Sequence, residues 1–247
     1  MTPRYSIVIP LYNEEAILPL LVHRLEELMD RIGEPTEVIL VDDGSTDVTG
    51  IFLEAKARED ERFRYIGLSR NFGQQIGITA GLDHAVGEAI IIMDGDLQDP
   101  PEVVPQMIEK WKEGFEIIYA KRRTRLHDSR MKRTMAALFY RAWNKVSSVK
   151  IPENVGDFRL VDRKVVDVFR KMPERERLVR GMFAWLGFRQ TCVEFDRPAR
   201  PAGQTQYPFS AQFRLGMSSM VGFSEVPLRL SIWAGITISI VAALFGT

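Results

Sequence analysis

Short apolar runs of strand length alternate with longer stretches of helical periodicity through the first 120 residues of the chain. The runs are long enough for buried strands and lie at residues 5–10, 38–41, 63–69, 89–93 and 116–120. The intervening helical patterns cover residues 16–32, 48–58, 74–86 and 102–113, the last opened by two prolines. This alternation predicts an α/β fold with a mixed, mostly parallel sheet and helices on both faces.

The turn after the first apolar run excludes one common class of α/β fold. A dinucleotide-binding domain would have the glycine-rich turn G-x-G-x-x-G there, and this chain has LYNEE instead. A hydrophobic content of 45 % also excludes a disordered chain. The sequence therefore argues against nicotinamide-dependent hydride transfer and for another α/β enzyme class.

Acidic residues gather directly after two of the predicted strands. Asp42 and Asp43 follow the second strand, and the segment DGDLQD at 94–99 follows the fourth. Because parallel strands end at the same edge of a sheet, we expect both groups to face one pocket. Asp94 and Asp96 could share a hard divalent cation, although aspartates in turns also cap helices or bind their own backbone. For Asp43, a turn or a helix cap toward Val48 and a role as ligand are both open.

The charges of the chain are unevenly distributed, although 33 basic and 33 acidic side chains cancel. Residues 1–120 hold 10 Lys and Arg against 23 Asp and Glu, whereas residues 121–247 hold 23 against 10. Seven of the basic residues fall within 121–133. Such a cluster can bind anionic lipid headgroups. A nucleic-acid partner is not supported, because no aromatic residues interleave the cluster and no binding motif accompanies it.

The last part of the chain has the pattern of membrane-associated helices. Residues 230–247 carry no charge, and we predict a transmembrane helix there, with a buried core helix as the alternative. Residues 129–149 form a basic amphipathic pattern. Residues 209–220 carry an apolar stripe that suits either the membrane interface or packing on the protein's own core.

The expected location follows from the ends of the chain and its cysteine content. The first apolar run is too short for a signal peptide, and the single cysteine, Cys192, cannot form an internal disulfide. Arg214 and Arg229 precede the predicted span and favour a cytoplasmic position for that side. We expect the catalytic part to lie on the cytoplasmic face of the plasma (inner) membrane.

Five motifs in order connect these features to a known family. They are IVIPLYNEE at 7–15, VDDGSTD at 41–47, LSRNFG at 68–73, MDGDLQDPPE at 93–102 and GDFRLVDR at 156–163. Together they resemble the inverting family 2 glycosyltransferases, and within these the polyprenyl-phosphate branch. The resemblance covers nearly the whole chain and implies a GT-A fold, a nucleotide-sugar donor and Mg²⁺ or Mn²⁺ as cofactor.

The resemblance also implies roles for residues in each motif. Pro10, Tyr12, Glu14 and Asp42 would bind the base and ribose, and Asp94, Gly95 and Asp96 would belong to the nucleotide-sugar site. Asp94, Asp96 and Gln98 would hold the metal and the diphosphate. Asp157 would be the catalytic carboxylate, and a salt bridge between Asp157 and Arg159 or Arg163 is the structural alternative. Because a phosphomonoester is largely ionised at neutral pH, Asp157 would orient the acceptor or sugar at least as much as accept a proton.

Basic residues would bind the acceptor and close the donor site. By resemblance, Arg122 and Lys132 are the residues for the acceptor phosphate. Arg200 and Gly203 match a segment that closes over the donor diphosphate in the family, but Gln206 stands where the family has a lysine. A neutral amide makes a weaker hydrogen bond to a diphosphate than a lysine does.

The predicted activity is transfer of a sugar, glucose from UDP-glucose in the first instance, to undecaprenyl or another polyprenyl phosphate. GDP-mannose or a UDP-aminosugar is the alternative donor, and a catalytically idle lipid-presenting subunit or a nucleotidyltransferase is the alternative class. The predicted domains are a catalytic domain at 1–200, an acceptor loop and interfacial segment at 201–229, and a first transmembrane helix of two at 230–247. Membrane lipids are expected partners, and a homo-oligomer is left open.

Overall fold

The computed structural model describes residues 2–123, 155–174, 177–196, 198 and 226–245. The chain divides into two compact units. The first comprises Met1–Arg125 and Asn154–Gln204, and the second comprises Leu126–Glu153 and Thr205–Thr247. All the strands described below belong to the first unit, and only one helix of the second unit is described.

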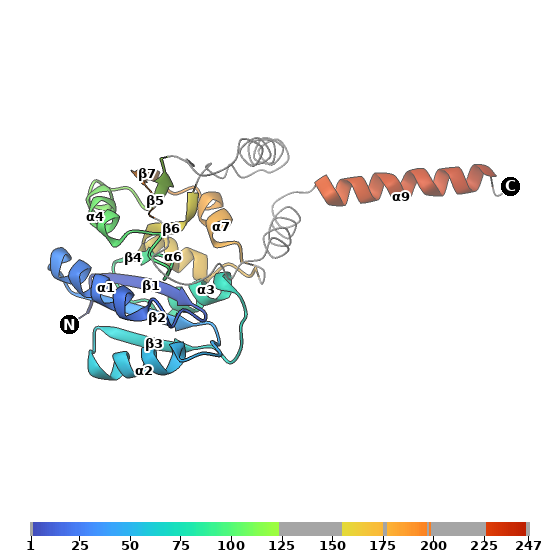
Figure 1. Cartoon of the computed structure of the whole chain (residues 1–247). Coiled ribbons are helices and arrows are strands. Elements are labelled where there is room, and N and C mark those ends of the chain that lie inside the picture. Colours follow the sequence, from blue (N-terminus) through green and yellow to red (C-terminus); the bar gives the residue numbers. More distant parts are fainter. Residues whose placement is uncertain (1, 124–154, 175–176, 197, 199–225, 246–247) are drawn as a thin grey trace. The chain divides into compact units, whose positions relative to one another are not determined.

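The described part of the first unit is built on a seven-stranded sheet (Figure 1). In chain order, its strands are β1 (Tyr5–Leu11), β2 (Thr36–Asp42), β3 (Phe63–Gly67), β4 (Ala89–Ile92), β5 (Ile117–Arg122), β6 (Val155–Asp162) and β7 (Gln190–Phe195). Across the sheet they lie in the order β3, β2, β1, β4, β6, β5, β7. All residues of β1, β2 and β4 are buried, as expected for central strands covered on both faces.

One strand of the sheet runs against the others. The pairs β1 with β2, β1 with β4, β2 with β3, and β5 with β7 are parallel. Strand β6 lies between β4 and β5 and is antiparallel to both. The predicted mixed, mostly parallel sheet is therefore confirmed.

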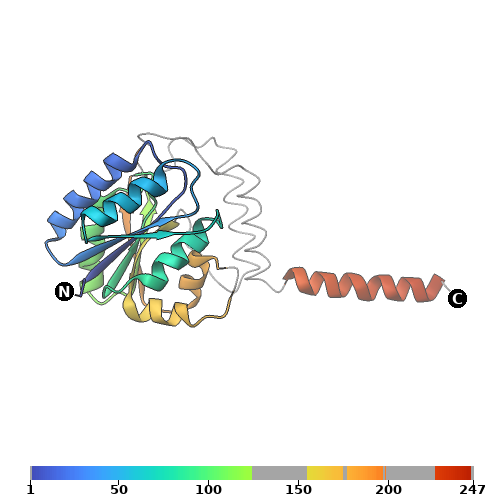
Figure 2. The same ribbon diagram turned by 90° about the horizontal axis from the view of Figure 1, so that it is seen from below.

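Helices cover both faces of the sheet (Figure 2). One face is covered by α1 (Leu18–Ile32), α2 (Thr49–Glu59) and α4 (Val104–Lys112), which follows the short 3-10 helix η1 (Pro101–Val103). The other face is covered by α3 (Gln74–His84), α6 (Arg163–Arg170) and α7 (Val179–Trp185). The helix patterns at 16–32, 48–58, 74–86 and 102–113 are thus confirmed, with small shifts at their ends.

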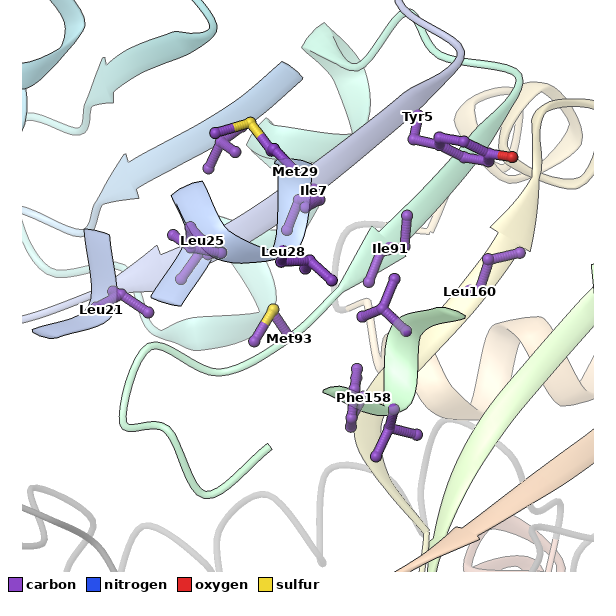
Figure 3. Packing of buried hydrophobic residues seen from close by; sticks show 14 of the residues in the cluster. Tyr5, Ile7, Leu21, Leu25, Leu28, Met29, Ile91, Met93, Phe158 and Leu160 are labelled. Carbon is purple, nitrogen blue, oxygen red and sulfur yellow. The ribbon is translucent and has the colours of Figure 1, made fainter. Parts of the chain in front are cut away.

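The core lies mainly between the sheet and the first helix layer. Figure 3 shows Leu21, Leu25 and Leu28 of α1 packed near Ile7 of β1 and Ile91 of β4. On the opposite face α3 approaches β1 closely because Gly81 has no side chain. A Cβ atom on Gly81 would lie 2.2 Å from Cγ1 of Val8. A Cβ atom there would also lie 3.2 Å from Cγ2 of Val41, so α3 packs closely on both β1 and β2.

The described part of the second unit is α9 (Val226–Phe245). A helix is therefore present where one was predicted, and Thr237 within it donates a hydrogen bond to the carbonyl of Trp233 over 2.8 Å. In the stretches of chain that the structure describes, none of the helices combines the length and the apolar character needed to cross a membrane. The transmembrane helix predicted at 230–247 is therefore not supported.

Several elements of the first unit were not predicted from the sequence pattern. These are β6, α6, α7 and β7, all of which follow residue 154. In β6 the buried polar residues Asp157 and Arg159 interrupt the apolar pattern that marks the other central strands. The amphipathic patterns at 129–149 and 209–220 lie outside the described residues.

Candidate active site

The acidic groups predicted to share a pocket do lie at one edge of the sheet. Asp42 is the last residue of β2, and Asp94 follows the end of β4, so both stand at the carboxyl ends of parallel strands. Strand β6 approaches this edge from the opposite direction, and Arg159 pairs with Ile92. Continuing that register by two residues brings Asp157 level with Asp94.

Hydrogen bonds connect the loops that follow β1 and β2. The backbone N–H of Asn13 donates to Oγ of Ser45 over 2.9 Å, and the N–H of Thr46 donates to Oδ1 of Asn13 over 2.8 Å. Asn13 itself has a φ of 52°, a left-handed conformation that asparagine tolerates better than most residues. The N–H of Glu14 donates to Oγ1 of Thr49 over 3.0 Å. Tyr12 and Glu14 are therefore held beside the Asp42 turn, and their role in binding the base and ribose stays a prediction.

Asp42 and Asp43 have different roles in this turn. Oδ1 of Asp42 accepts the N–H of Ser45 over 2.9 Å. Both oxygens of Asp43 accept backbone N–H groups, from Phe72 and Gly73, over 2.8 Å each. Burial raises the pKa of Asp43, and these two hydrogen bonds oppose that rise. Of the roles left open for Asp43, the helix cap toward Val48 is wrong, because its carboxylate holds the loop that precedes α3.

The segment 94–99 forms a compact turn after β4. The N–H of Asp94 donates to Oδ2 of Asp99 over 3.2 Å, and the N–H of Gln98 donates to Oδ1 of Asp96 over 2.9 Å. Gly95 packs so closely on the core that a Cβ atom there would lie 2.3 Å from Cδ2 of Leu11. The turn therefore fixes Asp94 and Asp96 on either side of a residue that tolerates no side chain without a shift of Leu11.

The donor atoms of this turn are compatible with a hard divalent cation. Within the described residues, no group of three or more His, Cys, Asp or Glu side chains lies in metal-binding geometry. Asp94 and Asp96 nevertheless offer carboxylate oxygens from one short turn, and Mg²⁺ or Mn²⁺ commonly completes such a set with substrate phosphate and water. The chemistry of the turn thus fits a cation that arrives with a diphosphate.

Asp157 is a buried carboxylate, with 8 % of the residue exposed. Its Oδ2 accepts a hydrogen bond from Nε2 of Gln75 over 2.9 Å. Its Oδ1 lies 3.9 Å from Nη2 of Arg159 and 3.9 Å from Nε of Arg180. The salt bridge with Arg159 that was left open is present at this distance. Arg163 instead donates to the carbonyl of Gly87 over 2.8 Å, so the alternative partner Arg163 is wrong.

Arg159 is a deeply buried charge of the site, with 3 % of the residue exposed. Its Nε donates to the carbonyl of Asp157 over 3.1 Å, and its Nη2 donates to the carbonyl of Gly156 over 2.8 Å. Burial lowers the pKa of Arg159 to about 10, an effect that the Asp157 carboxylate opposes and Arg180 reinforces. The guanidinium remains charged at neutral pH and fixes the backbone around Asp157.

Gln74 and Gln75, the first two residues of α3, were missed by the sequence reasoning. Nε2 of Gln74 donates to Oδ1 of Asp94 over 2.6 Å. Gln75 donates to Asp157, and its Oε1 accepts the N–H of Val179 over 2.9 Å. Two consecutive side chains therefore hold the predicted metal ligand and the predicted catalytic carboxylate. The only sequence signal is their position directly after the LSRNFG motif.

The basic residues at the end of β5 separate into two groups. Lys121 and Arg123 form ion pairs with Glu194, at 3.3 Å and 3.8 Å. Arg122 lies instead against Gly156, where a Cβ atom would be 3.3 Å from its Nη2. Arg122 is therefore next to the residue that precedes Asp157, and its role at the acceptor phosphate stays a prediction. Lys132, Arg200, Gly203 and Gln206 lie outside the described residues.

Comparison with known proteins agrees with this arrangement. The model of the family "Glycosyl transferase family 2" matches residues 6–169. The chain is 46 % identical to "Uncharacterized glycosyltransferase YkcC" of Bacillus subtilis over 96 % of its length and 73 % of that protein. It is 40 % identical to "Prophage bactoprenol glucosyl transferase homolog" of Escherichia coli over 98 % of its length and 79 % of that protein.

The solved structures agree on the fold. Glucosyl-3-phosphoglycerate synthase from Mycobacterium tuberculosis, in complex with Mn²⁺, UDP and phosphoglyceric acid, superposes with a TM-score of 0.56 at 18 % identity. The match covers 87 % of this chain and 75 % of that one, which shows a sheet of the GT-A type. The family match and the identity to its relatives go beyond the fold: this chain belongs to glycosyl transferase family 2.

Proposed function

We propose that this protein transfers a single sugar, glucose from UDP-glucose, to a polyprenyl phosphate with inversion at the anomeric carbon. The observation that carries the proposal is the pairing of two carboxylates by consecutive glutamines: Gln74 holds Asp94 and Gln75 holds Asp157. Asp94, which could bind a metal diphosphate, and Asp157, which could act at the reacting carbon, thus lie at the same edge of the sheet. The name of the E. coli relative, a bactoprenol glucosyl transferase homologue, supports this acceptor and sugar.

The donor nucleotide would lie over the fastened loops after β1 and β2. Pro10, Tyr12, Glu14 and Asp42 surround this part of the edge, and the hydrogen bonds between the loops fix them before a ligand arrives. Preorganisation of this kind lowers the entropy cost of binding. The diphosphate would extend from there toward the turn with Asp94, Gly95 and Asp96.

Asp94 and Asp96, with Gln98, would hold Mg²⁺ or Mn²⁺ at the diphosphate. A bound divalent cation supplies charge neutralisation for the departing nucleoside diphosphate. Gln74 contributes by holding Oδ1 of Asp94, and such partners of metal-binding carboxylates commonly affect metal affinity. The closing segment with Arg200 would add a cationic contact to the same diphosphate.

In the proposed reaction an oxygen of the acceptor phosphate attacks the anomeric carbon. The new bond from that carbon to the phosphate oxygen forms as its bond to UDP breaks, and UDP leaves with the electron pair. Asp157 orients the acceptor or the sugar at this centre, and Gln75 keeps its carboxylate in one orientation. Arg122, beside Gly156, and Lys132 would bind the acceptor phosphate.

The proposed reaction takes place at the cytoplasmic face of the plasma membrane, where its lipid acceptor is embedded. Helix α9 supports contact with lipid, because it exposes large apolar side chains. Among its described residues these include Ile232, Trp233, Ile238, Leu244 and Phe245, which are 52–87 % exposed. Exposed apolar surface of this kind commonly marks a binding site for a membrane or another protein.

A donor screen tests the proposal. The full-length protein is mixed with polyprenyl phosphate, Mg²⁺ or Mn²⁺, and UDP-glucose, GDP-mannose or UDP-N-acetylglucosamine labelled in the sugar. The expected result is lipid-extractable label from UDP-glucose, lost in Asp94→Asn and retained in Asp30→Asn, whose side chain is 79 % exposed on α1. If label enters the lipid from another donor alone, the assignment of glucose as the transferred sugar is wrong. If no donor labels the lipid, the proposal is overturned in favour of a lipid-presenting subunit.

A further inference from the structure

The two oxygens of Asp157 have different surroundings. Oδ2 accepts the hydrogen bond from Gln75, on the side where Gln74 also holds Asp94. Oδ1 is buried and has no hydrogen-bond partner among the described residues. It lies 3.9 Å from Nε of Arg180, which is also buried and without a hydrogen bond there. A separation of 3.9 Å is too long for a direct hydrogen bond.

The two arginines near Oδ1 differ in what they bind. Arg159 has 4 % of its side chain exposed and donates to the carbonyls of Gly156 and Asp157. Its guanidinium also lies over the ring of Phe183, 5.6 Å from the centroid. Arg180 has 28 % of its side chain exposed, and its ion-pair partner among the described residues is Asp157. Arg159 is thus part of the framework, whereas Arg180 reaches from the buried carboxylate toward the surface.

The charges around Oδ1 favour the binding of an anionic ligand. Among the described residues, two guanidinium groups face the one carboxylate of Asp157, so this group of three carries one positive charge in excess. A buried charged donor without a hydrogen bond is costly, and a ligand oxygen at Nε would remove that cost. The planar guanidinium also matches the geometry of phosphate oxygens. Gln75 holds Oδ2 and its neighbour Gln74 holds Asp94, whereas Oδ1 faces Arg180, which leaves Oδ1 as the side for an acceptor anion.

We propose that Arg180 binds the terminal phosphate of the polyprenyl phosphate acceptor and places one of its oxygens beside Asp157. This inference rests on the proposed function and adds a residue from α7 to the acceptor site. Arg122, beside Gly156, lies near the same stretch of β6. The backbone N–H of Val179, the residue before Arg180, is bound to Gln75, so the carboxylate and the cation are positioned by the same side chain.

The test compares Arg180→Met, which removes the charge, with Arg180→Lys, which keeps the charge but lacks Nε. Steady-state kinetics with varied polyprenyl phosphate and varied UDP-glucose give a separate KM for each substrate. The control is Arg58→Met, because Arg58 is 78 % exposed on α2 and pairs with Glu54 of the same helix. Binding of UDP with Mn²⁺, followed by calorimetry, and the thermal midpoint show whether the donor site and the fold are intact.

Loss of a charged hydrogen bond predicts that Arg180→Met raises the acceptor KM by about tenfold or more, with Arg180→Lys intermediate. UDP affinity and the donor KM would change by less than about twofold, as in the control. An acceptor KM equal to that of the wild type in both variants would overturn the role of Arg180 while leaving the proposed function intact. A rise in the donor KM instead would move Arg180 to the donor site. A wild-type protein that glycosylates no polyprenyl phosphate would overturn the function and this inference together.

Discussion

Replacing Gln75 with methionine tests how the site is held together. The side chain keeps its length but loses both hydrogen bonds, one to Oδ2 of Asp157 and one from the N–H of Val179. Asp157 is 8 % exposed and Val179 is fully buried, so neither group regains a partner easily. Each buried group left unsatisfied costs about 1–3 kcal/mol, so for the two groups we expect a loss of about 2–6 kcal/mol in the free energy of unfolding.

The expected loss is large enough to measure by thermal unfolding. For a chain of this size about 1 kcal/mol corresponds to about 2–4 °C, so the midpoint should fall by about 4–24 °C. The turnover number should fall as well, because the contacts left to the Asp157 carboxylate within the described residues are those with Arg159 and Arg180, at 3.9 Å each. UDP binding should stay close to that of the wild type.

Gln75→Glu serves as the matched variant. Its carboxylate can still accept the N–H of Val179, but it stands at hydrogen-bond distance from Asp157, and two carboxylates so close share one proton. The shared proton raises one pKa of this carboxylate pair in the folded state above its unfolded value. Relative to the wild type, the variant should therefore be most stable at acid pH and lose stability as the pH rises toward neutral. A Gln75→Met variant with the midpoint and turnover of the wild type would refute the positioning role.

Three further predictions concern other parts of the first unit. Asp157→Asn should lower turnover by about 100-fold or more while UDP affinity is kept. It should also destabilise the fold, because Arg159 loses its counter-ion. Unchanged turnover would remove Asp157 from the mechanism. Gly81→Ala should cost about 1–3 kcal/mol in urea unfolding, since its Cβ would lie 2.2 Å from Cγ1 of Val8, and a neutral effect would contradict the packing of α3 on β1. Burial and the Glu34 carboxylate raise the pKa of Tyr5 to about 12 from its ordinary 10.0, so stability is present below that ordinary value and lost as the pH rises through the folded value. Tyr5→Phe should lose less stability than the wild type between about pH 9 and about pH 11, and equal losses would contradict this reasoning.

Much of the fold could be predicted because its central strands are continuous apolar runs. Strands β1, β2 and β4 are buried on both faces, and that environment selects side chains such as those of Ile7, Val8 and Ile91. The edge that carries Asp42 and Asp94 followed from the parallel arrangement alone. Local periodicity was sufficient for these central strands, because burial determines their residues.

Parts of the fold and of the site could not be predicted, because function or contacts distant in sequence determine which residues occupy them. Strand β6 contains Asp157 and Arg159, which are buried as a charged pair and so hide its strand pattern. Gln75 binds partners 82 and 104 positions further along the chain, and no local pattern reports such contacts. The same is true of Asp43, whose carboxylate holds a loop 29 and 30 positions away. A buried aspartate after a strand can equally cap a helix, bind a ligand or fasten another loop.

The most direct test of the central claim is the identity of both products from UDP-glucose and a polyprenyl phosphate. The lipid product is analysed by mass spectrometry and by phosphorus and proton NMR, and the released nucleotide is quantified in the same reaction. The account predicts a glucosyl phosphodiester of the lipid with the β-configuration, formed in equal amount to UDP, and a rate of formation lowered by about 100-fold or more in Asp157→Asn. Release of pyrophosphate, retention of the α-configuration, or release of UDP without a glycosylated lipid would contradict it.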